Sequence, residues 1–195
     1  NSIRINPKKP THQFDTEAVV PWCKTGRYLQ HRPSFTFDPL FHGGTYYVQE
    51  ASSMFLEFAL LQHVAFVQRL RVLDLCASPG GKSTHIASLI SDDSLLISNE
   101  VIGTRVNMLS ENLSKWGYDN TWVSHNDPAR YANLSHYFDI MLVDAPCSGS
   151  GLFRKIPDYQ ADWNEELVTL CAQRQQRIVH DAYAALARNG LLVYM

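Results

Sequence analysis

The chain has 195 residues, 45% of them apolar, which is enough to bury the core of one full domain together with a small additional piece. Seventeen basic against nineteen acidic residues give a formal net charge of -2, which excludes a general electrostatic attraction to nucleic acid, so any polyanion must bind a local patch. The four cysteines have neither paired zinc spacing nor the density of a disulfide scaffold, so we expect reduced thiols and no metal.

Residues 1–50 are rich in proline and aromatic residues, with short extended runs at residues 2–6 and 44–48. This composition predicts short strands joined by loops, and hence a small α+β piece. Over residues 50–69 apolar side chains recur near helical spacing, with Ser52 and Ser53 as candidate caps, which predicts a helix. We find no signal-peptide core and no stretch of membrane-spanning length, and therefore expect a cytoplasmic protein without membrane contact.

From residue 71 onward the pattern alternates between strand and helix. This order predicts an α/β fold with a Rossmann-like, doubly wound and mostly parallel sheet. The chain stops inside the fifth strand, so we expect the domain of residues 51–195 to be incomplete at its C-terminal end. The predicted strands are residues 71–76, 95–100, 121–124, 139–144 and 191–194, and the predicted helices are residues 82–90, 103–116 and 164–188, the last ending at Asn189-Gly190.

A glycine turn follows the first of these strands. Residues 72–84 run from a buried strand through Ser78-Pro79-Gly80-Gly81 into a helix, which predicts a ligand site at this edge of the sheet. Gly81-Lys82-Ser83 also matches the end of a Walker A phosphate loop. Cys76 stands where that loop needs its first glycine, however, and Pro79 makes the turn rigid, so a nucleoside triphosphate is the weaker alternative.

Acidic residues follow the next two strands. Glu100 ends the second strand about 20 residues after the glycines, where a carboxylate can accept hydrogen bonds from both hydroxyls of a ribose. Asp127 follows the third strand and could accept from an adenine amino group. A solvated strand end for Glu100 and a helix N-cap for Asp127 are the structural alternatives. Their shared position around one glycine turn favours a nucleoside cofactor.

A proline–cysteine loop, Asp144-Ala145-Pro146-Cys147-Ser148-Gly149, follows the fourth strand. Glycine and serine beside Cys147 indicate an accessible loop, in which the thiol could act as nucleophile or base; a small buried hydrophobe is the structural alternative. Packing explains the other three cysteines. Arg154 and Lys155, with Trp163 nearby, could contact a phosphate backbone or form a solvated turn.

On three motifs in this order, the chain resembles the Sun/Fmu-like (RsmB/RsmF-type) family of RNA cytosine-5 methyltransferases, which modify rRNA or tRNA. The motifs are residues 74–82, 144–149 and 47–54. The resemblance implies S-adenosylmethionine as cofactor, RNA as partner and a partial RNA-binding subdomain in residues 1–50. The cofactor-binding residues that we predict are Cys76, Ala77, Ser78, Pro79, Gly80, Gly81, Lys82, Glu100, Arg105, Asp127 and Asp144.

The resemblance also implies a mechanism in which a cysteine thiolate adds to C6 of a flipped-out cytosine, so that C5 can accept the methyl group. It assigns Asp144 to the cytosine edge, Lys82 to the base or the cofactor, and Cys147 to product release. The attacking cysteine of these RNA enzymes lies in a threonine–cysteine pair after the fifth strand, which we expect to be missing here. In DNA cytosine-5 methyltransferases the proline–cysteine motif itself supplies the nucleophile.

Two other functions stay open. A methyltransferase acting on an exocyclic amine or on a protein would need no cysteine in its active site. A non-catalytic RNA-binding module could stack bases on Phe41, Tyr46 and Tyr47, although a place in the core explains these aromatic residues better. The sequence does not predict an oligomeric state.

Overall fold

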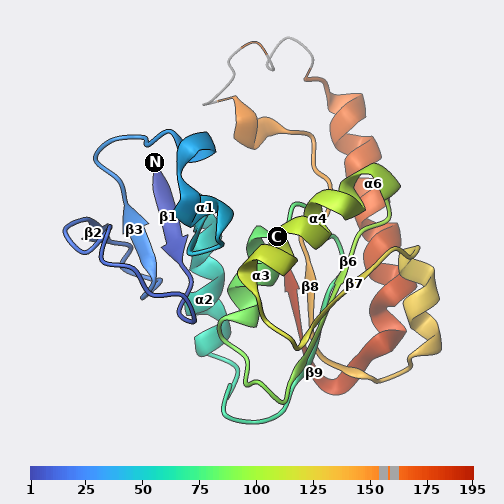
Figure 1. The fold of residues 1–195 in the computed structure, drawn as a ribbon. Helices are drawn as coiled ribbons and strands as arrows, with labels where there is room; N and C mark the ends of the chain where they lie inside the picture. The colour runs from blue at the N-terminus through green and yellow to red at the C-terminus, as the bar shows by residue number, and fades with distance from the viewer. Residues whose placement is uncertain (154–157, 159–162) are drawn as a thin grey trace.

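The computed structural model describes residues 1–153, 158 and 163–195, and Figure 1 shows their arrangement. Residues 1–50 form a small antiparallel sheet, with the one-turn helix α1 (Pro39–His42) before its last strand. Ile3, Phe14, Leu29 and Tyr46 form its core. The strand order is β2 (Ala18–Val19), β3 (Gly26–Tyr28), β1 (Ser2–Ile5) and β4 (Tyr46–Val48).

Five parallel strands form the main sheet, which confirms the predicted α/β class. The two strands that follow β5 in the chain pair outward on one side, and the last two pair on the other, so the order reverses beside β5. Across the sheet the strands are β7 (Thr121–Ser124), β6 (Leu95–Asn99), β5 (Arg71–Asp74), β8 (Phe138–Val143) and β9 (Leu186–Tyr194).

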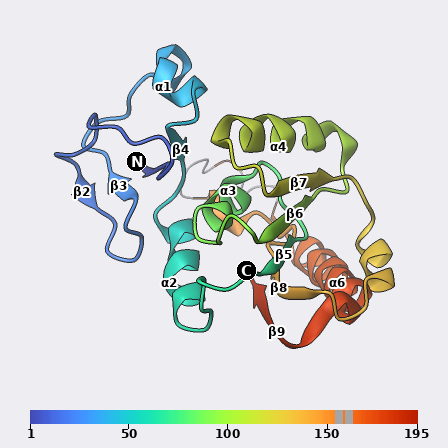
Figure 2. The same ribbon diagram turned by 60° about the horizontal axis from the view of Figure 1, so that its bottom comes forward.

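Helices cover both faces of this sheet, as Figure 2 shows. Successive residues of β5 point to opposite faces. Val72 packs with residues of α2 (Phe55–Leu61), α3 (Gly81–Ala87) and α4 (Gly103–Trp116). Leu73 packs with α6 (Glu165–Ala182) and the 3-10 helix η3 (Pro128–Asn133) on the other face. This is the doubly wound arrangement that the sequence predicts.

The predicted helix over residues 50–69 is too long. Residues 52–54 form a 3-10 turn, neither Ser52 nor Ser53 caps a helix with its side chain, and α2 ends at Leu61. Phe55 and Phe58, two of the apolar residues near helical spacing, are 49% and 45% exposed. Leu56 and Leu60 pack against the sheet instead.

The last predicted helix is wrong at its C-terminal end. α6 ends at Ala182, a 3-10 turn follows, and Asn189-Gly190 lies inside β9. Leu186 pairs with Phe138 and Leu191 with Ile140, so β9 bulges between these pairs. A side chain at Gly190 would place its Cβ 2.8 Å from Leu186 and 3.1 Å from the Asp139 carbonyl. Gly190 is therefore needed because β9 and β8 pass close together at this point. From the sequence alone, Asn189-Gly190 indicated the end of a helix.

Among the helices of the described residues, none combines the length and the apolar character needed to cross a membrane.

Candidate functional site

The glycine turn, residues 76–82, joins β5 to α3 as predicted. The Ala77 amide donates to the Asn99 carbonyl at 2.8 Å, and the Gly80 amide donates back to Ala77 at 2.7 Å. Gly80 precedes α3 with a φ of 107°, a left-handed conformation that costs any residue with a side chain. The positive φ at this position therefore explains why the sequence has a glycine there.

Asp74 supports this turn from the end of β5, and sequence reasoning did not single it out as a site residue. Its carboxyl group is fully buried; one oxygen accepts from the Ser83 hydroxyl at 2.6 Å, and the other has no partner among the described residues. Burial raises the pKa of Asp74 to about 7. The nearby charge of Lys82 opposes this shift, and the charge of Asp144 adds to it, so the pKa of Asp74 depends on both of these residues.

Lys82 and Asp144 form an ion pair across the strand ends. The Lys82 ammonium lies 2.5 Å from a carboxylate oxygen of Asp144, and its side chain is 16% exposed, against 41% for Asp144. The lysine comes from the first turn of α3 and the aspartate from the loop after β8. Two residues that the sequence predicts as catalytic are thus brought together at the edge of the glycine turn.

Glu100 is buried at the end of β6, which excludes a solvated strand end. One carboxylate oxygen accepts from the Ile102 amide at 2.9 Å, and the other lies 3.5 Å from the Arg105 guanidinium. Arg105 also donates to the Ser78 carbonyl at 2.7 Å, and the Ser78 hydroxyl donates back to the Arg105 carbonyl. Arg105 therefore links the glycine turn to the predicted ribose-binding carboxylate.

Asn99 fixes the loop that leads to Asp127, and sequence reasoning missed it. Its amide nitrogen donates to the carbonyls of Leu75 and Asn126, and its oxygen accepts from Ser124 and from the Asn126 amide. Asp127 is exposed and caps η3, accepting from the Ala129 amide at 3.0 Å. The N-cap alternative is thus present in the structure, and the adenine contact stays a prediction.

Cys147 is exposed, which excludes the buried alternative for this thiol. The preceding Pro146 carbonyl accepts from Gln175 of α6 at 2.9 Å, and Gln175 in turn accepts from Tyr194 of β9 at 2.6 Å. The loop is therefore held on the sheet while its cysteine faces solvent. The predicted phosphate contacts, Arg154 and Lys155, lie outside the described residues; Trp163 is 40% exposed.

Two hollows lie away from the glycine turn. One, of about 850 Å³, lies between α6 and β9, and its lining includes Gln175, Tyr183 and Tyr194. The other, of about 870 Å³, lies in the N-terminal piece beside Tyr28 and Arg32. The glycine turn is a better candidate for a cofactor, because within the part of the chain that the structure describes it is where buried carboxylates, turn backbone and a charged pair converge.

Residues 62–195 match the 16S rRNA methyltransferase RsmB/F family, which covers more than half of the chain. The chain belongs to this family. Residues 1–51 match a second description, the N-terminal domain of 16S rRNA methyltransferase RsmF. The resemblance to RsmB/RsmF-type proteins that the sequence motifs indicate is therefore confirmed.

Curated relatives of this RsmB/F chain include proteins described as ribosomal RNA small subunit methyltransferase F. The protein of Serratia proteamaculans (strain 568) is 38% identical over 181 residues, which cover 90% of this chain and 37% of the relative. A relative of Vibrio cholerae serotype O1 (strain M66-2) is 37% identical, with 99% and 43% of the two chains covered. The chain thus spans about two fifths of the length of these relatives.

Solved structures share the fold of this RsmB/F chain. A methyltransferase homolog protein from Pyrococcus horikoshii is 30% identical with a TM-score of 0.80, covering 99% of this chain and 63% of that one. NSun6 from Pyrococcus horikoshii with SFG is 26% identical with a TM-score of 0.69, covering 84% and 41%. The Rossmann-like methyltransferase fold predicted from the strand order is therefore confirmed.

Proposed function

We propose that this chain is the cofactor-binding part of an RNA cytosine-5 methyltransferase, which transfers a methyl group from S-adenosylmethionine to C5 of a cytosine in rRNA. The observation that carries the proposal is the meeting of Lys82, Asp144 and the Cys147 loop at the carboxyl edge of the sheet, beside the glycine turn. Membership of the RsmB/F family and the names of the relatives support rRNA over tRNA. An rRNA substrate also favours a cytoplasmic location.

The residues around the glycine turn fit an adenosine-containing cofactor. Glu100 offers a buried carboxylate at the strand end where a ribose would lie, and its 3.5 Å contact to Arg105 is long enough for ribose hydroxyls to replace it. Asp127 has one oxygen outside its capping hydrogen bond. Backbone amides in the first turn of a helix have no intrahelical acceptor, so those of α3 can donate to the polar end of the cofactor.

The chemistry requires that C5 of cytosine, which is unreactive in the free base, become nucleophilic before transfer. The cofactor, when bound, supplies the electrophilic methyl group. Asp144 accepts a hydrogen bond from the amino edge of the base, and its ion pair with Lys82 fixes the direction in which this carboxylate points. The attacking thiolate comes from the threonine–cysteine motif of the family and adds to C6; after methyl transfer a base removes the C5 proton and the C6–sulfur bond breaks. Cys147, exposed three residues after Asp144, acts in this release of the product.

The N-terminal piece offers a surface for RNA. The groove of about 870 Å³ is lined by Trp22, Tyr28, Arg32 and Phe35, so that a cation and aromatic rings occur together. By contrast, Tyr46 is 2% exposed and belongs to the core of the small sheet, which removes it from the base-stacking candidates. Bases would therefore stack on the groove.

The test is methyl transfer from labelled S-adenosylmethionine to 16S rRNA by the complete protein, with the Cys147→Ala variant compared with Cys171→Ala. If Cys147 releases product, covalent protein–RNA adducts accumulate in Cys147→Ala and not in Cys171→Ala, whose thiol is buried in α6. Loss of all adducts in Cys147→Ala would instead make it the attacking residue. Absence of any transfer to RNA, with transfer to protein or to an amine, would reject the proposal.

A further inference from the structure

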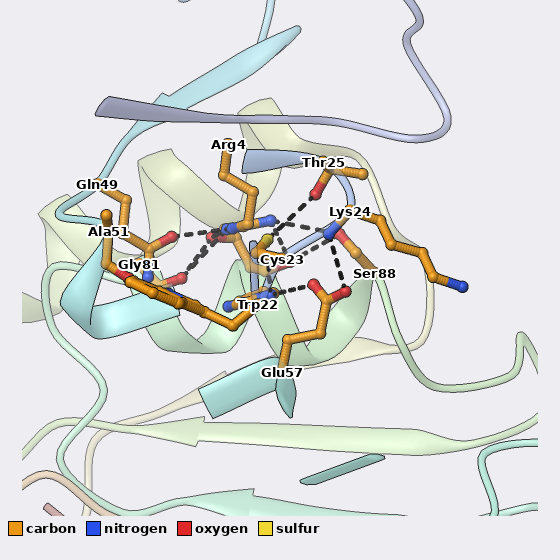
Figure 3. Close-up of polar contacts among 12 residues, drawn as sticks. Arg4, Trp22, Cys23, Lys24, Thr25, Gln49, Ala51, Glu57, Gly81 and Ser88 are labelled. Carbon is orange, nitrogen blue, oxygen red and sulfur yellow. Dashed lines mark hydrogen bonds and ion pairs between the residues drawn. The ribbon is translucent and has the colours of Figure 1, made fainter. Parts of the chain in front are cut away.

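Arg4 is a fully buried arginine that reaches from the small N-terminal sheet to the helix of the glycine turn. It lies on β1, and its relative exposure is 0%. Figure 3 shows its guanidinium with Gln49 and Gly81 on one side and Ser88, which follows α3, on the other. A buried cation is costly unless it is paired and hydrogen-bonded, so this position calls for an account of its partners.

The guanidinium binds the first turn of α3 with several donors at once. Nη2 donates to the Gly81 carbonyl at 3.2 Å and to the Thr84 hydroxyl at 2.6 Å, and Nη1 donates to the Thr84 carbonyl at 3.4 Å. Nε donates to Gln49, and the Trp116 ring lies 4.5 Å from the guanidinium carbon. A lysine has one ammonium group and cannot span these separated acceptors.

Burial lowers the pKa of Arg4 to about 10, and the nearby Glu57 carboxylate on α2 is among the groups that oppose this shift. Burial opposes ionisation of Glu57, but hydrogen bonds from His85, Cys23 and the Lys24 amide lower its pKa overall. Burial, with the charge of Arg4, lowers the pKa of His85 to about 4, so the imidazole is neutral and donates to Glu57 at 2.9 Å. The buried cluster thus combines one cation, one carboxylate and neutral donors.

A metal is a poor occupant of this cluster, although its donor atoms invite the question. Cys23, Glu57 and His85 each offer a ligand atom, and these atoms lie within 4.8 Å of one another. Burial raises the pKa of Cys23 to about 11, so a metal would have to displace a tightly held proton, and the Arg4 guanidinium already places a positive charge in this cluster. A divalent cation beside a buried guanidinium would be repelled.

The helix that Arg4 contacts needs outside support. α3 has only seven residues, too few for a stable helix without tertiary contacts. Its first residues, Gly81 and Lys82, belong to the glycine turn. Tyr47 of β4 also touches this region, since a Cβ at Gly81 would come 3.2 Å from its ring. The N-terminal sheet therefore lines the back of the turn whose front faces the proposed cofactor site.

We propose that Arg4 is a positioning residue for the glycine turn: held by the N-terminal sheet, its guanidinium fixes the Gly81 and Thr84 carbonyls and so orients Gly80–Lys82 toward the cofactor. This inference rests on the proposed function, because it assigns the cofactor to that turn. If Arg4 has this role, the N-terminal piece is a structural part of the cofactor site, although residues 1–51 and residues 62–195 match two different family descriptions.

The test is calorimetric titration of this chain with S-adenosylmethionine in the Arg4→Lys and Arg4→Met variants, together with hydrogen exchange of the α3 amides. We expect about tenfold weaker binding and about tenfold faster exchange at Thr84 in both variants, because lysine restores the charge without the spread of donors. Arg27→Lys is the matched control, since Arg27 donates to the Lys24 and Gly26 carbonyls and touches no residue of α3 in the described contacts.

A second control separates positioning from stability. Phe14→Leu destabilises the core of the N-terminal sheet and leaves the Arg4 contacts in place. Each variant is titrated at a temperature that lies equally far below its own melting temperature. Equal loss of affinity in Phe14→Leu and Arg4→Lys would overturn the inference, as would unchanged affinity and exchange in Arg4→Lys. If the unmodified chain does not bind the cofactor, the proposed function fails, and exchange at Thr84 still decides whether Arg4 orders the turn.

Discussion

The ionisation of Asp74, which supports the glycine turn, should make the free energy of unfolding depend on pH. Asp74 is fully buried, one of its oxygens has no hydrogen-bond partner among the described residues, and burial raises its pKa to about 7 from an ordinary value of 3.8. A raised pKa favours the protonated folded state, so this contribution is complete below about pH 4 and is lost as the pH rises through 7. Each pH unit in that window costs about 1.4 kcal/mol, which gives about 2 to 3 kcal/mol between pH 5 and pH 7.

Asp74→Asn removes the titration while keeping an oxygen that can accept from Ser83. The assay is urea unfolding of both proteins at pH 5, 6, 7 and 8. We expect the free energy of unfolding of Asp74→Asn, relative to the unmodified chain, to increase by about 2 to 3 kcal/mol from pH 5 to pH 7. Ser83→Ala should move the titration to higher pH, since it removes a hydrogen bond that lowers the pKa of Asp74. A pH-independent difference between Asp74→Asn and the unmodified chain would refute the reasoning.

Two further substitutions test the geometry of the site by denaturant unfolding. Gly80→Ala should cost about 1 to 2 kcal/mol, because Gly80 has a φ of 107°, whereas Gly151→Ala, with nothing within 4 Å of its Cβ position, should change stability by less than about 0.5 kcal/mol. Equal effects of the two would contradict the strain argument. Asn99→Ala should cost about 2 to 3 kcal/mol, because it leaves the buried Leu75 carbonyl and the partly buried Asn126 carbonyl and Ser124 hydroxyl without this partner. An unchanged denaturant midpoint of unfolding in Asn99→Ala would show that water replaces the hydrogen bonds of the Asn99 side-chain amide.

The main sheet and its glycine turn could be predicted because their signals are local. Alternating strand and helix patterns fix a parallel sheet, and the carboxyl ends of parallel strands meet at one edge. Residues that follow different strands, such as Lys82 and Asp144, therefore meet without any knowledge of the tertiary structure. The same logic placed Glu100 near the turn, and Arg105 connects the two through Ser78.

What could not be predicted depends on contacts distant in sequence. Arg4 and Thr84 are 80 residues apart, and nothing in the short run around Arg4 indicates a buried guanidinium. Cys23, which the sequence explains by packing, lies in a polar cluster with His85 because two separate elements meet there. The Asn189-Gly190 pair signals a helix stop locally, and only the pairing of β9 with β8 shows that it belongs to a bulge.

The most direct measurement of the central claim is calorimetric titration of this chain with S-adenosylmethionine and, separately, with ATP, repeated on Glu100→Ala. We expect saturable binding of S-adenosylmethionine and no binding of ATP. Glu100→Ala should weaken the binding of S-adenosylmethionine by about 1.5 to 3 kcal/mol, because it removes hydrogen bonds to a buried carboxylate. Binding of ATP without binding of S-adenosylmethionine would contradict the central claim, because the glycine turn would then hold phosphates as a Walker A loop does.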